Sequence, residues 1–235
     1  MNNITIGLPC YNEEKNIINC IKEILKNFDA HNDVEILVVD NNSTDNTIKV
    51  VNDFVAANKL ENKLNIIQNK SNITYSGSIN VIIQNAKYEN IGIMDSDGQY
   101  LANDFDKLFN KLNEGYDLVF GKRVQRNDTF LRKFISYVFK LLTQNLIKHN
   151  LTDLNCGIKT LKRNSKITNY TSIYINHANP ELYCVYNYYK LKITEVPVSH
   201  LNRTEGDSIH NIFNLISTFF SVLAYLRYLK KKYSI

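Results

Sequence analysis

The four cysteines of this sequence form no C-x-x-C pair and lie far apart, at Cys10, Cys20, Cys156 and Cys184. This spacing argues against a zinc site or a dithiol redox motif, and it favours reduced, structural thiols. The first residues also lack the basic stretch followed by an apolar one that a signal peptide needs, and Pro9 falls where its apolar core would lie. We therefore expect a cytoplasmic protein that is not secreted.

The sequence also lacks a large excess of charge of one sign. The formal net charge is +5 over 235 residues, and the basic residues are spread along the chain instead of forming a stripe. This distribution argues against nucleic acid as a partner. A hydrophobic content of 44% is enough for one sizeable core, so the length favours one catalytic domain with an extension.

Short apolar runs alternate with segments of helical periodicity along the first half of the chain. Strands separated by helices of this length imply right-handed crossovers and a mostly parallel sheet in an α/β fold. The first strand is expected to stop at Pro9. The predicted strands of this half cover residues 4–8, 35–40, 64–68 and 90–94.

The second half continues the pattern with one exception. A strand over residues 116–121 is followed by a long amphipathic helix over about 129–148, and the last strand covers 193–198. Residues 153–159 resemble a turn leading into a short edge strand that returns antiparallel to the others. The fold domain is predicted to cover residues 1–208.

Carboxylates stand where two of the predicted strands end. Asp40 ends the second strand, and Asp95 and Asp97 follow the fourth, with Gln99 two positions further on. The carboxyl ends of parallel strands share one edge of a sheet, where ligands bind, so these side chains should line one crevice. Two adjacent carboxylates need a cation, and hard oxygen ligands suit Mg²⁺ or Mn²⁺ shared with a pyrophosphate. The alternative is an ordinary turn, because Asp, Ser and Gly are common turn residues.

A basic bend follows the strand that ends near Gly121. It carries Lys122, Arg123 and Arg126, and the long helix after it carries Arg132 and Ser136. These side chains could bind an anionic substrate. The alternative is a solvated run of charges on the surface.

The segment from 209 to 235 differs from the rest of the chain. Apolar residues recur at helical spacing, polar residues lie largely opposite, and Lys230, Lys231 and Lys232 follow. A bilayer-spanning helix needs about 20 predominantly apolar residues, and the polar positions in this segment argue against spanning. Two interpretations stay open: a helix lying in an anionic membrane surface, or a helix packed on the core of the domain.

Several short motifs together resemble the family 2 glycosyltransferases of the GT-A fold, nearest the dolichyl-phosphate or polyprenyl-phosphate mannose synthases. Each motif is weak alone, but they occur in the expected order along nearly the whole chain. The motifs are Pro9-Cys10-Tyr11-Asn12-Glu13-Glu14, Val38-Val39-Asp40-Asn41-Asn42-Ser43-Thr44-Asp45, Asp95-Ser96-Asp97-Gly98-Gln99, Gly121-Lys122-Arg123 and Arg203-Thr204-Glu205-Gly206-Asp207-Ser208.

The resemblance implies roles for individual positions. Asp95, Asp97 and Gln99 would bind the metal, and Asn41 and Gly98 depart from the residues usual at their positions. Asp97 would act in catalysis together with arginines that gather the acceptor phosphate and the leaving diphosphate. The implied nucleotide-sugar positions are Pro9, Tyr11, Glu13, Asp40, Asp95 and Gln99. The implied phosphate-binding positions are Arg123, Arg132, Ser136 and Arg203, of which the three arginines are catalytic.

The implied reaction is the inverting transfer of a sugar from a GDP- or UDP-sugar to a polyprenyl phosphate at a membrane surface. The alternative acceptor is a glycan hydroxyl, which would need a carboxylate base, and Asp153 and Glu181 are the evident candidates. A nucleotidyltransferase is disfavoured because the loop after the first strand is neither glycine-rich nor basic. A non-catalytic sugar-binding subunit is disfavoured because Asp95, Asp97 and Arg203 would then be uncompensated charges without a use.

Overall fold

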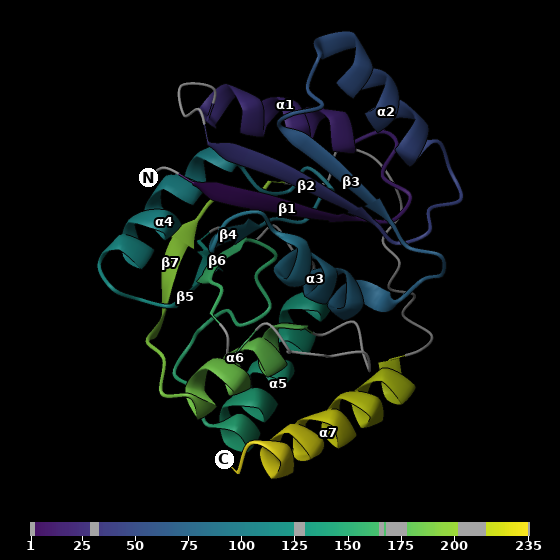
Figure 1. Cartoon of the computed structure of the whole chain (residues 1–235). Helices are drawn as coiled ribbons and strands as arrows, with labels where there is room; N and C mark the ends of the chain where they lie inside the picture. Colours follow the sequence, from purple (N-terminus) through teal and green to yellow (C-terminus); the bar gives the residue numbers. More distant parts are fainter. Residues whose placement is uncertain are drawn as a thin grey trace.

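The computed structural model describes residues 3–28, 33–124, 130–164, 167, 178–201 and 215–234. Strands and helices alternate over the first half, as the apolar periodicity predicts (Figure 1). The strands are β1 (Ile4–Cys10), β2 (Val34–Asp40), β3 (Leu64–Gln68), β4 (Asn90–Ile93), β5 (Leu118–Arg123), β6 (Lys159–Lys162) and β7 (Ile193–Val198). The helices are α1 (Ile17–Phe28), α2 (Thr47–Asn58), α3 (Thr74–Asn85), α4 (Phe105–Asn113), α5 (Phe130–Ile147), α6 (Ala178–Tyr188) and α7 (Leu215–Lys232), with a short 3₁₀ turn (Ala102–Asp104) before α4.

The seven strands form one sheet in the order β3-β2-β1-β4-β6-β5-β7. All neighbouring pairs are parallel except those of β6, which runs antiparallel to both β4 and β5. The predicted α/β fold with a mostly parallel sheet is therefore confirmed. The prediction of an edge strand after residue 153 is wrong in one respect, because β6 lies inside the sheet.

Helices cover both faces of the sheet, and each face has its own hydrophobic cluster. Helices α1, α2 and α4 pack on one face, and α3, α6 and α7 on the other, together with the end of α5 (Figure 1). Alternate residues of β2 show the division, since Ile36 and Val38 belong to the first cluster and Leu37 and Val39 to the second. A strand covered on both faces is apolar along its whole length.

The prediction that Pro9 stops the first strand is wrong. β1 runs through Pro9 to Cys10, and Pro9 pairs with Val39 of β2. On its other side, β1 pairs with β4 only as far as Gly7. The Pro9 carbonyl on that side accepts a hydrogen bond from the Ser96 hydroxyl at 2.8 Å. Proline has no N–H to donate, but Pro9 lies beyond the last residue pair of β1 with β4. The sheet therefore loses no hydrogen bond at this position.

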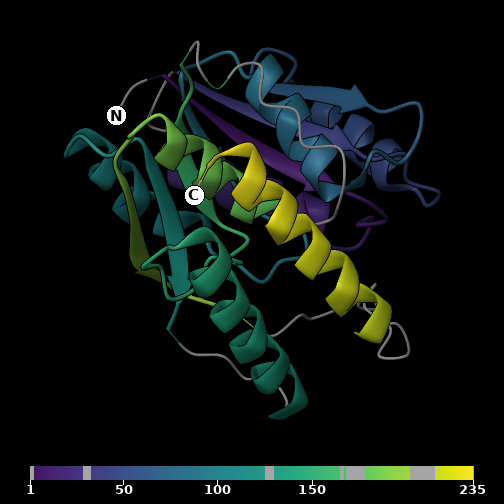
Figure 2. The same ribbon diagram turned by 90° about the horizontal axis from the view of Figure 1, so that it is seen from below.

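The C-terminal helix α7 packs on the domain. Its Val222, Leu226 and Leu229 are buried in the same cluster as α3 and α6, and Figure 2 shows α7 running alongside α5. The outer side carries Phe219 and Phe220, which are 41% and 62% exposed. Among the described helices, none is both long enough and apolar enough to cross a membrane.

Glu181, in the first turn of α6, holds α7 in place. Its carboxylate accepts hydrogen bonds from the Tyr225 hydroxyl (2.8 Å), the Lys232 ammonium (2.8 Å) and the Tyr233 hydroxyl (3.3 Å). The Glu181 side chain is 2% exposed. A buried carboxylate is stable only when its oxygens are paired in this way.

We expect Glu181→Ala to lower the free energy of unfolding by about 2–4 kcal/mol, because the buried Tyr225 and Tyr233 hydroxyls lose their acceptor. Urea denaturation measures the loss. The matched control is Glu114→Ala, since Glu114 pairs with Lys111 but its side chain is 53% exposed. That change should stay within about 1 kcal/mol of the wild type. Equal effects of the two substitutions would contradict this role of Glu181.

All four cysteines are buried and free, as their spacing predicts. Burial raises the pKa of the Cys20, Cys156 and Cys184 thiols to about 12. Thiols of such high pKa are poor nucleophiles at neutral pH, so these three cysteines serve packing.

Candidate active site

The parallel strands β1, β2 and β4 end at one edge of the sheet (Figure 1), and acidic residues stand at the ends of β2 and β4. Asp40 is the last residue of β2, and Asp95 follows the end of β4 by two positions. The ends of β1 and β2 are joined by a hydrogen bond from the Asn41 N–H to the Cys10 carbonyl at 2.9 Å. This edge is where parallel α/β sheets bind their ligands.

Asp40 points into its own loop. Its carboxylate accepts the Ser43 N–H, at 3.3 and 3.2 Å from its two oxygens, and also the Ser43 hydroxyl. Asp40 is 0% exposed. It therefore orders the turn after β2, and its contact with a nucleotide base stays a prediction.

Hydrogen bonds link the loop after β1 to the loop after β2. The Asn12 N–H donates to the Ser43 hydroxyl (2.9 Å), the Thr44 N–H donates to the Asn12 side chain (2.8 Å), and the Glu13 N–H donates to the Thr47 hydroxyl (2.8 Å). Asn12 has a φ of 57°, a left-handed conformation that Asn tolerates better than most residues. Tyr11 and Glu13, two of the predicted nucleotide positions, lie partly exposed on this cross-linked pair of loops. Pro9 is buried in β1.

Asp95 is clamped from two sides. The Tyr75 hydroxyl donates to its Oδ1 at 2.7 Å. Its Oδ2 lies against the backbone of Gly157, where a Cβ would come within 2.0 Å of that oxygen. Position 157 must therefore be glycine for Asp95 to keep this orientation.

Asp97 and Gln99 lie on the turn that follows. The Gln99 N–H donates to Asp97 Oδ1 at 3.1 Å, and Gly98 between them has a φ of 76°, which favours glycine. The Gln99 side-chain amide donates to the Leu201 carbonyl at 3.2 Å, so its oxygen is the end available to a ligand. The structure thus places Asp95, Asp97 and Gln99 together on one partly exposed turn.

These side chains fit a divalent cation that shares its ligands with a substrate. Two carboxylates and one amide oxygen are hard ligands of the kind that Mg²⁺ and Mn²⁺ prefer. Across the described ranges, no group of three or more His, Cys, Asp or Glu residues gathers into a metal cage. Mg²⁺ is commonly bound in proteins by only one or two carboxylates, with waters and substrate phosphates as the other ligands.

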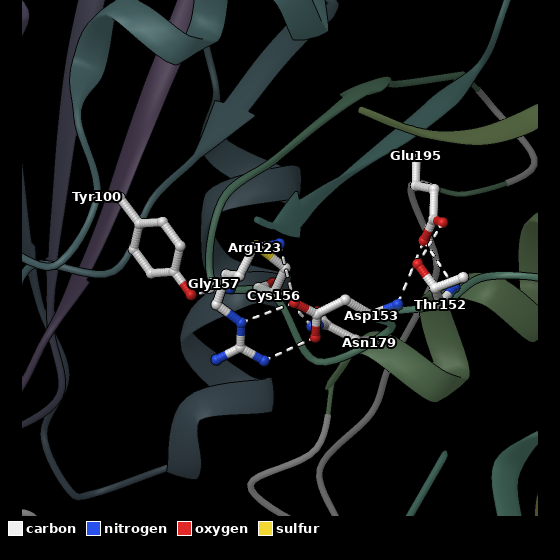
Figure 3. Close-up of polar contacts among 8 residues, drawn as sticks. All are labelled: Tyr100, Arg123, Thr152, Asp153, Cys156, Gly157, Asn179 and Glu195. Atoms are coloured by element: carbon white, nitrogen blue, oxygen red, sulfur yellow. Dashed lines mark hydrogen bonds and ion pairs between the residues drawn. The ribbon is translucent and has the colours of Figure 1, made fainter. Parts of the chain in front are cut away.

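Arg123, the last residue of β5, is fixed by Asp153 (Figure 3). Its Nε and Nη2 each donate to a different carboxylate oxygen at 2.7 Å, and its backbone N–H donates to the same carboxylate at 3.1 Å. Burial has the largest single effect and opposes the charge on Arg123, but the hydrogen bonds with Asp153 and the electrostatic interactions with Tyr100, Asp153 and Cys156 together raise the pKa of the guanidinium. Glu195 of β7 in turn accepts the N–H groups of Thr152 and Asp153, at 2.7 and 3.2 Å.

A cleft of about 350 Å³ opens beside this ion pair, between α5 and the loop before β6. Burial lowers the pKa of His149, on its wall, to about 4, so His149 is neutral at neutral pH. Arg123 and Ser136 both line the cleft, which brings together two of the predicted phosphate-binding residues. The side chain of Arg132 and the whole of Arg203 lie outside the described residues, so their roles stay predictions.

Both candidate bases are engaged in ion pairs. Asp153 binds Arg123 through both oxygens, and Glu181 binds Lys232 and the hydroxyls of Tyr225 and Tyr233. Both oxygens of each carboxylate thus already accept hydrogen bonds from side chains of the protein. The arrangement disfavours either residue as the base that a hydroxyl acceptor would need.

A mostly parallel sheet with flanking helices, and a D-x-D-x-Q turn at the carboxyl edge of its strands, define the GT-A class of nucleotide-sugar transferases. The sequence pattern of glycosyl transferase family 2 matches residues 5–167. The chain belongs to this family and is a glycosyltransferase.

Relatives and solved structures agree with this assignment. The undecaprenyl-phosphate 4-deoxy-4-formamido-L-arabinose transferase of Proteus mirabilis is 23% identical over 96% of this chain and 68% of its own length. The glucosyl-3-phosphoglycerate synthase of Mycobacterium tuberculosis superposes with a TM-score of 0.70 at 16% identity, covering 100% of this chain and 81% of that one. A mannosyltransferase of Pyrobaculum calidifontis, in complex with GDP-Man and Mn²⁺, gives 0.64 at 17% identity, covering 88% and 58%.

Proposed function

We propose that this chain transfers a sugar, with inversion, from a GDP- or UDP-sugar to a polyprenyl phosphate, using Mg²⁺ or Mn²⁺. The observation that carries the choice of acceptor is the engagement of both candidate bases, Asp153 and Glu181, in ion pairs. A phosphate monoester is already anionic and attacks without losing a proton, whereas a glycan hydroxyl needs a base. The undecaprenyl-phosphate transferases among the relatives support the same acceptor class.

The donor would bind at the carboxyl edge of the sheet. Pro9, Tyr11, Glu13 and Asp40 would form the pocket for base and ribose. Asp95, Asp97 and Gln99 would hold the cation together with the donor diphosphate. The bound cation would offset the charge that develops on the leaving diphosphate. Solved structures of the same fold contain Mn²⁺ with UDP or with GDP-Man, which supports this arrangement.

The acceptor phosphate would bind in the cleft beside Arg123 and Ser136, with Arg132 and Arg203 completing the set of phosphate ligands. Arg pairs well with phosphate because its guanidinium presents several donors in one plane. A phosphate oxygen attacks the anomeric carbon and forms the new C–O bond. The bond to the diphosphate oxygen breaks on the opposite side, and its electron pair leaves with the nucleoside diphosphate.

The outer side of α7 would rest on the cytoplasmic face of a membrane, where a polyprenyl phosphate resides. Exposed Phe219, Phe220 and Tyr228 support this, together with the basic residues Lys230 and Lys231 at the end of the helix. Aromatic and basic side chains on one helix suit an anionic interface. The helix α7, within the predicted extension 209–235, would then both pack on the domain and contact lipid.

Two measurements test the function. A thermal-shift panel of UDP, GDP and their sugars with Mn²⁺ should raise the melting temperature for one nucleotide. Transfer from the matching sugar should reach undecaprenyl phosphate and stop when EDTA removes the metal. Undecaprenol, which offers a hydroxyl in place of the phosphate, is the control acceptor. Transfer to undecaprenol at an equal rate, or transfer that survives EDTA, would overturn the proposal.

A further inference from the structure

A buried lysine lies behind the predicted metal ligands. Lys159 is the first residue of β6, inside the sheet between β4 and β5, and it is 0% exposed. Its ammonium donates to the Gly157 carbonyl at 3.2 Å and to the Tyr75 hydroxyl oxygen at 3.3 Å. Fully buried lysines are rare because their charge must be compensated.

The groups that Lys159 binds are also the groups that clamp Asp95. Tyr75 accepts from Lys159 and donates to Asp95 Oδ1 at 2.7 Å, while Gly157 packs on Oδ2. The negative charge of Asp95 thus lies one hydroxyl away from the ammonium. Burial lowers the pKa of Lys159, and the charge of Asp95 opposes that shift.

This arrangement changes the charge of the turn that would bind the cation. Asp95 and Asp97 alone would carry two negative charges, and the Lys159 ammonium cancels one of them. A divalent ion is attracted less to such a site than to two uncompensated carboxylates. The two negative charges of a diphosphate would restore the attraction when donor and metal bind together.

We propose that Lys159 is the built-in counter-charge of this site, which positions Asp95 through Tyr75 and makes cation binding depend on the nucleotide diphosphate. The inference rests on the proposed function, because it assumes that the turn binds a metal with a nucleotide. Lys159 is a positioning residue, since Tyr75 stands between it and Asp95.

The test compares Mn²⁺ binding, measured by calorimetry without nucleotide, in the wild type and in two variants. Lys159→Met removes the charge, and Lys159→Gln removes the charge but keeps a hydrogen-bond donor. We expect both to bind Mn²⁺ alone about tenfold more tightly than the wild type, because one positive charge near the ion is gone. The gain in Mn²⁺ affinity that the nucleoside diphosphate produces should shrink correspondingly.

Lys162→Met is the matched control, because Lys162 ends the same strand and pairs with Asn90, at the far end of β4 from Asp95. It should leave Mn²⁺ affinity unchanged. Unchanged or weaker Mn²⁺ binding in both Lys159 variants would overturn the inference. Loss of folding in both Lys159 variants would also overturn the inference, because the charge of Lys159 would then be needed only for the stability of the sheet. A wild type that binds Mn²⁺ but no nucleotide would instead refute the proposed function.

Discussion

Replacing Asp97 by asparagine is expected to lower kcat/KM for sugar transfer about 1,000-fold or more, without unfolding the protein. An asparagine Oδ1 can still accept the Gln99 N–H that Asp97 accepts at 3.1 Å, so the turn is kept. The negative charge that would hold the cation is lost. Stabilisation of a leaving group by a metal amounts to several kcal/mol, and each 1.4 kcal/mol, roughly, is a factor of ten in rate.

The measurement is steady-state transfer at saturating Mn²⁺, together with calorimetric Mn²⁺ binding in the presence of the nucleoside diphosphate. Asp53→Asn makes the same chemical change at an exposed pair with Lys49, where the Asp53 side chain is 70% exposed. It should leave both quantities unaltered. Normal turnover by Asp97→Asn would refute the metal site, whatever the fold.

The strand ends could be predicted from sequence because their signals are local. An apolar run that stops at Asp40, or directly before Asp95, indicates both the strand and the polar edge beyond it. The parallel order then follows from helices of sufficient length between strands. The confirmed fold and the grouping of Asp95, Asp97 and Gln99 on one turn both rest on such short-range patterns.

The clamp around Asp95 could not be predicted, because its members come from distant parts of the chain. Tyr75 and Lys159 meet although 84 positions separate them. The contact depends on β6 inserting antiparallel between β4 and β5, and the sequence placed this strand at an edge. The strand itself gave no warning, because β6 reads Lys-Thr-Leu-Lys and lysines are mostly exposed in folded proteins.

The sequence also could not decide between the two interpretations of the C-terminal segment. Periodicity identifies an apolar face, but it does not say whether protein or lipid covers that face. In the structure, Leu226 and Leu229 are 0% exposed within the domain, whereas Phe220 is 62% exposed on the same helix. The proposed membrane contact therefore depends on the exposed aromatic side chains of α7, and not on its whole apolar face.

Arg123→Lys is expected to raise the KM for undecaprenyl phosphate and to lower kcat/KM for it about 10- to 200-fold, with the KM for the donor sugar unchanged. Lysine keeps the charge, but its single ammonium cannot bind both oxygens of Asp153 as the guanidinium does at 2.7 Å each. If the lysine ammonium pairs with Asp153, the side chain has no further nitrogen with which to bind a phosphate in the cleft. Hydrogen bonds to charged groups contribute about 1.5–3 kcal/mol, which sets the expected range.

Initial rates with the acceptor varied at fixed, saturating donor measure this effect. Lys122→Arg is the matched control, because Lys122 precedes Arg123 on β5 but its side chain is 43% exposed, with Glu195 at 3.8 Å. It should change neither KM. Thermal unfolding of Arg123→Lys separates a local effect from a loss of fold, since Glu195 still holds the Thr152 and Asp153 N–H groups. An unchanged acceptor KM in a folded Arg123→Lys protein would remove Arg123 from the acceptor site and leave the cleft without its best-fixed cation. A rise in the donor KM alone would instead assign Arg123 to the leaving diphosphate.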